Sequence, residues 1–258
     1  NVDGAKNVAV GSYALTASNP ASATNTFNVA VGHQAGTAVT TGIRNTIMGG
    51  LAGDALTTGS KNVAIGSFSL SAEDEHGFNV AVGYATLNVQ NAGANAYNVA
   101  VGYQAGLAVT TGIGNLLIGG QAGDSLTTGF FNTAMGRSAL SAATIGNNNV
   151  AVGKDAMKIN VASDRNVAVG VEALVSMTSA STVDQYNVAV GFQAGGAVTS
   201  GIKNTIIGSL AGNALTTGDN NIIIGIDAAA SAVGADNETV IGTATTTNAI
   251  VHGLRTPL

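Results

Sequence analysis

A five-residue pattern, three uncharged and mostly apolar residues between an Asn and a Gly, recurs along the whole chain, as in Asn28-Val29-Ala30-Val31-Gly32. Successive copies begin 17 residues apart in ten of thirteen steps, and 19 or 21 residues apart in the others. A fixed period of this kind is typical of stacked copies of one unit, none of which buries its apolar face alone. A fourteenth copy begins at Glu238, and the other thirteen begin at Asn7, Asn28, Asn45, Asn62, Asn79, Asn98, Asn115, Asn132, Asn149, Asn166, Asn187, Asn204 and Asn221.

One unit, for example residues 204–220, contains two short β-prone stretches separated by Gly-containing turns. Seventeen residues are too few for two strands and a helix but suffice for one coil of a β-solenoid. We therefore predict an all-β solenoid of about 14 coils over residues 1–246, followed by a C-terminal junction or tail at 247–258, where the pattern is lost. With coils about 4.8 Å apart, the solenoid is a rod roughly 65 Å long.

The two faces of each predicted strand are both apolar. The fourth motif residue is always large and apolar, so we expect it to point into the roll together with the second. The third residue, usually Ala, then points outward, and an uncharged outward face has to be covered by another chain. The predicted subunit contact is formed by Ala9, Ala30, Ala64, Ala81, Ala100, Ala134, Ala151, Ala168 and Ala189.

The thirteen motif asparagines form a column along the rod. Amide side chains at this spacing can hydrogen-bond as a ladder, or the Asn can simply suit the turn that leads into the strand; both interpretations are structural. Extra residues fall at 16–26, 88–96 and 177–185, where we predict loops on one rim that are candidates for ligand binding.

The Asn-Val-Ala-Val-Gly unit, followed by x-x-Ala or x-x-Ser, resembles the YadA-like head repeats of trimeric autotransporter adhesins over about residues 5–246. Similar repeats occur in bacteriophage tail fibres, and the pairing of Gln34-Ala35-Gly36 with Thr57-Thr58-Gly59 is closer to those. The resemblance implies a left-handed parallel β-roll, a homotrimer and an extracellular location, on a virion tail fibre or a bacterial surface. The 17-residue period and the apolar residue or Thr after Asn depart from the adhesin pattern.

Composition supports a surface that meets other protein chains. Only 9% of residues are charged and the mean hydropathy is +0.31, whereas ordinary domains carry about 25% charged residues. A net charge of −5 without a basic cluster favours neither nucleic acid nor an anionic membrane. Absence of Cys excludes disulfides and thiolate metal sites, and no apolar run is long enough to insert this segment in a membrane.

Candidate chemistry is sparse. The three histidines, His33, His76 and His252, lack partners at metal-ligand spacing. The acidic turn Glu73–His76 offers oxygen ligands for Ca²⁺, although a solvated turn is the favoured interpretation. The nucleophile-elbow, phosphate-loop and zinc-helix motifs do not occur, so we predict no catalytic, metal or cofactor site.

Aromatic and cationic residues share the position directly before the motif Asn. They form either a strip for glycan or protein contact, or packing between coils and salt bridges within a trimer, which we favour. The aromatic residues are Phe27, Phe78, Tyr97, Phe131 and Tyr186, and the cations are Lys6, Arg44, Lys61, Arg165 and Lys203.

These features predict a non-enzymatic, homotrimeric fibre segment that attaches to a cell-surface protein or glycan through many weak contacts. A bacterial adhesin head is the main alternative to a phage tail fibre. A left-handed β-helix acyltransferase fits less well, because a period of 17 drifts against hexapeptide repeats. An ice-binding protein also fits less well, because only six of fourteen coils carry a Thr-Thr or Thr-Ser pair.

Overall fold

In the computed structural model, residues 6–19, 25–178, 184–243 and 245 are described, so the predicted tail at 247–258 lies outside the described residues, as do parts of the loops at 16–26 and 177–185. Each motif copy forms one three-residue strand, and the fourteen strands form a single parallel sheet in chain order. The predicted all-β solenoid with a coil spacing of about 17 residues is therefore confirmed. The strands are β1 (Val8–Val10), β2 (Val29–Val31), β3 (Thr46–Met48), β4 (Val63–Ile65), β5 (Val80–Val82), β6 (Val99–Val101), β7 (Leu116–Ile118), β8 (Thr133–Met135), β9 (Val150–Val152), β10 (Val167–Val169), β11 (Val188–Val190), β12 (Thr205–Ile207), β13 (Ile222–Ile224) and β14 (Thr239–Ile241).

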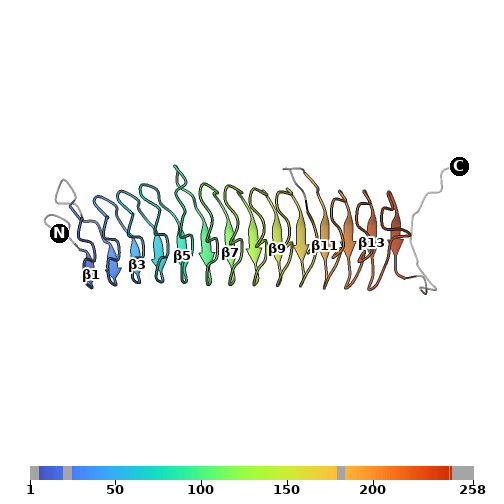
Figure 1. Ribbon diagram of the computed structural model, residues 1–258, viewed down its shortest axis with the longest axis horizontal. Coiled ribbons are helices and arrows are strands. Elements are labelled where there is room, and N and C mark those ends of the chain that lie inside the picture. The colour runs from blue at the N-terminus through green and yellow to red at the C-terminus, as the bar shows by residue number, and fades with distance from the viewer. Residues whose placement is uncertain (1–5, 20–24, 179–183, 244, 246–258) are drawn as a thin grey trace.

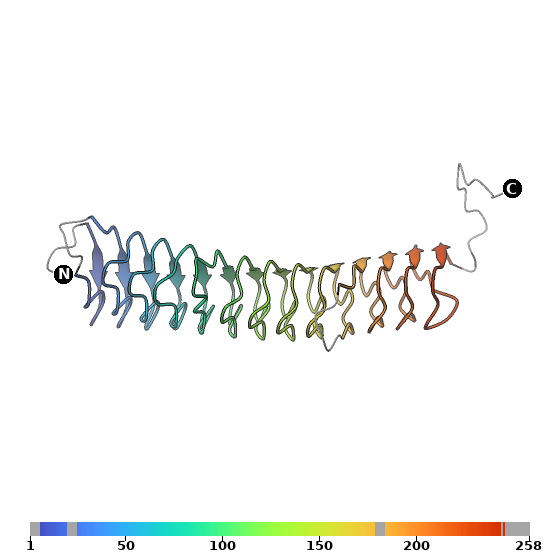
Figure 2. The ribbon, with the colours of Figure 1, turned by 90° about the horizontal axis from the view of Figure 1, so that it is seen from above.

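The molecule is a rod with the sheet along one side and turns along the others (Figure 1). Equivalent motif positions stack on one another, as in the pairing of Ala30 with Ile47 and of Val31 with Met48. Seen from above, the strands turn gradually from face-on near β1 to nearly edge-on near β14 (Figure 2). The outward face of the sheet therefore winds around the rod.

The motif Gly column is fixed by close contact between coils. Gly32 has a φ of +138°, and a Cβ on it would lie 2.5 Å from the carbonyl oxygen of Gly49 in the next coil. No side chain fits at that distance, and L-residues rarely adopt that φ. Glycine is therefore required wherever the strand turns into the rest of its coil.

The interior of each coil is narrow, and its volume is shared among a few positions. Counting the motif Asn as the first residue, six coils have Gly at the ninth position, and in all six the twelfth residue is Val or Leu. A Cβ on Gly53, at the ninth position, would lie 2.9 Å from Leu56 Cδ1, at the twelfth. Where the ninth residue is itself large, as with Leu140, the twelfth is small, polar or flexible, as with Ala143. This exchange keeps the core close-packed along the rod.

Candidate interaction surface

The alanines predicted as the subunit contact lie inside the roll, so that prediction is wrong. Ala30, Ala64, Ala81, Ala100, Ala134, Ala151, Ala168 and Ala189 are all 0% exposed in the single chain, and only Ala9, in the first coil, is exposed. The reason is space. The third motif residue faces the large residue at the ninth or twelfth position across a thin interior, so Ala fits there, and Ile47 fits opposite Gly53.

The second and fourth motif residues point outward and form a long apolar stripe. Their side chains are half-buried or exposed in every strand, and no charged residue occupies either position in any copy. Met48 and Ile207 are 40% and 39% exposed. A contiguous apolar surface of this length is unusual on a monomer and is typical of a protein contact. The strand is therefore apolar on both faces, as inferred, but the third motif residue points inward and the second and fourth point outward.

The thirteen motif asparagines are placed at the inner corner of the roll, where they hold each coil to the next. Asn115 Oδ1 accepts a hydrogen bond from the backbone N–H of Asn132 at 3.0 Å, and Asn115 Nδ2 donates to the carbonyl of Gly129 at 2.9 Å. The bond to Oδ1 repeats along the column, whereas Nδ2 of Asn7 and of Asn79 has no partner in the part of the chain that the structure describes. In some steps the amides also bond to each other, as from Asn149 Nδ2 to Asn132 Oδ1. The Asn115 side chain thus bonds to the end of its own coil through Nδ2 and to the start of the next coil through Oδ1.

The residues directly before the motif Asn line one edge of the apolar stripe. All thirteen that are not glycine have a left-handed φ, between +52° and +66°, which turns their side chains toward the outside. Phe78 and Tyr97 stack with their ring centroids 5.0 Å apart, and the Lys61 ammonium lies 4.5 Å from the Phe78 centroid. The Phe78 ring therefore lies between Lys61 and Tyr97, so that ring does not form an open platform for a sugar ring.

A carboxylate occupies the core at a position where six other coils have Leu or Val. Glu73, at the twelfth position of its coil, is fully buried. Its Oε2 accepts a hydrogen bond from Gln90 Nε2 at 3.0 Å, its Oε1 accepts one from the His76 N–H at 3.1 Å, and Gln90 Oε1 accepts one from Asn98 Nδ2 at 3.0 Å. The sequence places Glu73 in register with Leu56, but we interpreted it only as part of a turn.

Potential metal ligands meet in that turn. Ligand atoms of Glu73, Asp74 and His76 lie within 4.8 Å of one another, and His76 Nδ1 lies 3.4 Å from Glu73 Oε1. Both Glu73 oxygens already accept hydrogen bonds from the protein, so the buried carboxylate has a structural role without a bound metal ion. Of the other histidines, His33 contacts Tyr13 edge to face at 6.3 Å, and His252 lies outside the described residues.

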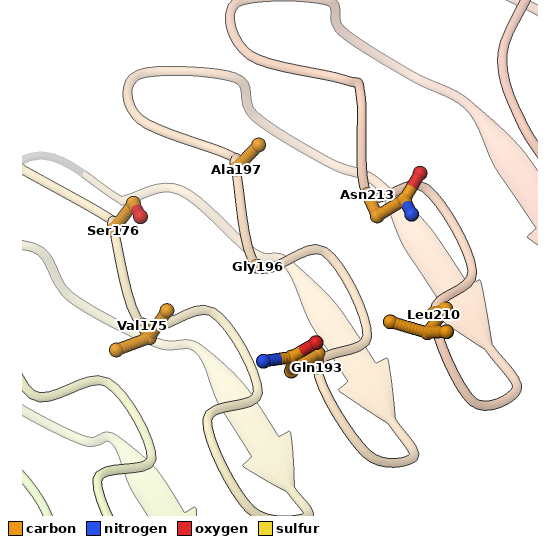
Figure 3. A pocket seen from close by; sticks show the side chains of 7 residues that line it. All are labelled: Val175, Ser176, Gln193, Gly196, Ala197, Leu210 and Asn213. Atoms are coloured by element: carbon orange, nitrogen blue, oxygen red, sulfur yellow. The ribbon is translucent and has the colours of Figure 1, made fainter.

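Shallow notches line the face formed by the turns. One, of about 280 Å³, is lined by residues of three successive coils, among them Val175, Gln193 and Asn213 (Figure 3). A second, of about 480 Å³, contains Asp124, whose Oδ1 is buried without a hydrogen-bond partner. Burial raises the pKa of the Asp124 carboxyl, and backbone N–H donors only partly offset this. No histidine lines either notch.

Comparisons with known proteins do not assign this surface. Within the described parts of the chain there is no helix with the length and apolar character needed to cross a membrane. No protein-family model matches the sequence, and neither curated proteins nor solved structures give a match. What the protein does is therefore inferred from the surface itself.

Proposed function

We propose that the protein is a non-enzymatic segment of an extracellular fibre, which assembles as a homotrimer through the outward face of its sheet. The observation that carries this proposal is the apolar stripe formed by the second and fourth motif residues along the rod. Fourteen coils repeat the same uncharged face, so the surface that covers it must have the same period. A second copy of the chain has that period.

Threefold assembly follows from the resemblance of the repeat to YadA-like heads and phage tail-fibre repeats. Three parallel rods around one axis cover three apolar faces at once and leave the turns outside. The low share of charged residues, 9%, agrees with a chain of which one whole side meets other chains.

Attachment to a cell-surface protein or glycan is the role that this architecture favours. A rigid rod holds its turns and rim loops at fixed spacing, and three copies multiply each weak contact. Avidity from linked sites exceeds single-site affinity by about 10²–10⁴.

Binding to whole cells tests the attachment role. Fluorescently labelled native protein is incubated with a panel of bacterial and animal cells beside a variant with Val101→Lys, which places a charge in the apolar stripe. We expect the native protein to remain on at least one cell type after washing and the variant to wash off. Failure of the native protein to bind any cell would remove attachment from the proposal and leave assembly to be tested separately.

A further inference from the structure

Two columns of side chains flank the apolar stripe, one at each end of the strands. We call the residue directly before the motif Asn the leading residue, and the residue directly after the motif Gly the trailing residue. In the coil of β6 these are Tyr97 and Tyr103, which are 58% and 55% exposed. Each column runs the length of the rod.

The two columns vary together in eleven of the fourteen coils, and the other three coils, which have Asn as the leading residue, have Lys154, Ile226 and Thr243 as trailing residues. In every coil with an aromatic leading residue, the trailing residue is aromatic, His or Arg, and these five pairs are Phe27–His33, Phe78–Tyr84, Tyr97–Tyr103, Phe131–Arg137 and Tyr186–Phe192. In every coil with a cationic leading residue, the trailing residue is Ser, Gly or Val, and these five pairs are Lys6–Ser12, Arg44–Gly50, Lys61–Ser67, Arg165–Val171 and Lys203–Ser209. Where the leading residue is Gly114, the trailing residue is Gly120.

The matched residues do not touch within one chain. Six residue steps with an extended strand between them span up to about 20 Å. Two of the ring contacts found among the described residues run along the columns instead, Phe78 with Tyr97 at 5.0 Å and Tyr84 with Tyr103 at 5.6 Å. None joins the leading and trailing residues of one coil, so contact inside the monomer does not explain the matching.

Duplication of coils explains only part of the matching. The coils of β2, β6, β7 and β11 share a Gln-Ala-Gly sequence, beginning at Gln34, Gln104, Gln121 and Gln193, and all but the coil of β7 have related ring pairs. The pairs Phe78–Tyr84 and Phe131–Arg137 lie in coils without that sequence. Within the related coils, both members also change, from Phe and His to Tyr and Phe. The matching therefore reflects contact between the two columns.

We propose that in the assembly the leading column of each copy lies against the trailing column of the next copy, coil for coil. This inference rests on the proposed self-assembly and adds its direction and register. In a closed ring of parallel copies, each contact joins two different edges, one from each copy. Because the copies lie at the same level along the axis, each contact brings together the leading and trailing residues of equivalent coils. The Tyr97 ring then packs on Tyr103 of the neighbouring copy, and the Arg137 guanidinium lies over the neighbouring Phe131 ring.

The cationic coils fit the same arrangement. A long Lys or Arg side chain can extend over a neighbouring Ser or Gly and keep its charge in water. A slip of one coil would place Arg44 against His33 and Phe78 against Ser67. The columns thus favour one register over its neighbours, although the apolar stripe is nearly the same in every coil.

Cross-linking between introduced cysteines tests the register, because the chain has no cysteine of its own. Lys203→Cys with Ser209→Cys in one chain places thiols on the leading and trailing columns of the same coil. Lys203→Cys with Ser67→Cys is the matched control, with thiols eight coils and roughly 38 Å apart along the rod. Lys203→Cys with Gly50→Cys reports an antiparallel pair, in which the twelfth coil meets the third.

Each variant is treated with a short bis-maleimide after its mass in solution has been measured. We expect K203C/S209C to give covalent multimers up to the full assembly, and the other two variants to remain single chains on a denaturing gel. An assembled K203C/S209C protein that does not cross-link, or cross-linked multimers from either other variant, would overturn the register. A monomeric mass for the native protein would overturn the self-assembly itself, which distinguishes the two failures.

Discussion

The backbone N–H of Asn132 donates a hydrogen bond to Oδ1 of Asn115, one coil earlier, at 3.0 Å. Asn115→Ala would leave this buried N–H and the carbonyl of Gly129 without partners. We expect a loss of about 2–4 kcal/mol in the free energy of unfolding, measured by chemical denaturation. Asn213→Ala is the matched control, because that Asn is exposed and its loss should change stability by less than about 0.5 kcal/mol. Equal effects would refute a clamping role for the column.

The motif Gly should tolerate no side chain. A Cβ on Gly102 would lie 2.5 Å from the carbonyl oxygen of Gly119, at a φ of +139°. We expect Gly102→Ala to destabilise the protein by about 3–5 kcal/mol in thermal or chemical denaturation. Gly120→Ala is the control, because a Cβ there meets nothing within 4 Å and its column carries Tyr and Lys in other coils. A stable Gly102→Ala protein would contradict the tight contact between coils.

Adjacent residues of β6 distinguish the two faces of the sheet. Val101 points outward, so Val101→Lys should lower the mass of the assembly in solution while the circular dichroism spectrum stays native. Ala100 is fully buried, so Ala100→Lys should unfold its coils by burying an unpaired charge. If Ala100→Lys dissociates the assembly without unfolding it, the orientation of the strand described here is wrong.

Coupling between Tyr97 and Tyr103 gives a second measure of the edge contact. The two side chains do not touch in one chain, so in a monomer their Ala substitutions should add. Contact between copies predicts a coupling of about 0.5–1.5 kcal/mol in a double-mutant cycle, read from the denaturation of the assembly. Tyr97→Ala combined with Phe192→Ala, five coils away, is expected to be additive. Coupling in the distant pair alone would contradict the register.

Asp124 predicts a specific pH dependence. Burial raises the pKa of its carboxyl in the folded protein, so the folded state holds this proton more tightly than the unfolded chain does. The stability from this group is full below about pH 3.9, the ordinary Asp value, and is lost as pH rises through the folded pKa. We expect Asp124→Asn to raise the melting temperature at pH 7 and to have little effect at pH 3. Asp227→Asn, at an exposed carboxyl in a nearby column, is the control; an equal rise there would show that net charge alone is responsible.

The period of the motif was sufficient to predict the number of coils and the parallel stacking, because each repeat carries one strand and one obligatory Gly. Alternation along the strand showed correctly that the second and fourth residues share a face. Alternation alone did not show which face is inside. The large size of the fourth residue favoured an inward position, whereas the structure places the small third residue inside. The interior is so thin that Leu140, from the turn, fills it and leaves room only for a small residue, Ala134, on its strand.

A signal for the correct orientation was present in the sequence. In the first twelve coils, large third residues occur only together with Gly at the ninth position, as Ile47 with Gly53 and Leu117 with Gly123. In the structure a Cβ on Gly123 would lie 2.8 Å from Leu117 Cδ2, so these positions compete for the same interior space. Two columns that exchange volume in this way must face each other inside the roll.

The Glu73–Gln90 contact was harder to predict. Only alignment of the twelfth positions shows that Glu73 lies in a core column, and the adjacent Asp74 and Glu75 make the segment look like a solvated turn. Gln90 occupies the twelfth position of the next coil, 17 residues after Glu73, so the stacking of coils places the two side chains in one column once the register is known.

Mass in solution, measured by light scattering coupled to size exclusion, tests the central claim that the outward apolar face is covered by copies of the same chain. Each chain has a mass of 25.2 kDa. We predict a single species of three chains that keeps its mass on dilution. A monodisperse species of one chain, with the apolar stripe open to water, would contradict the account.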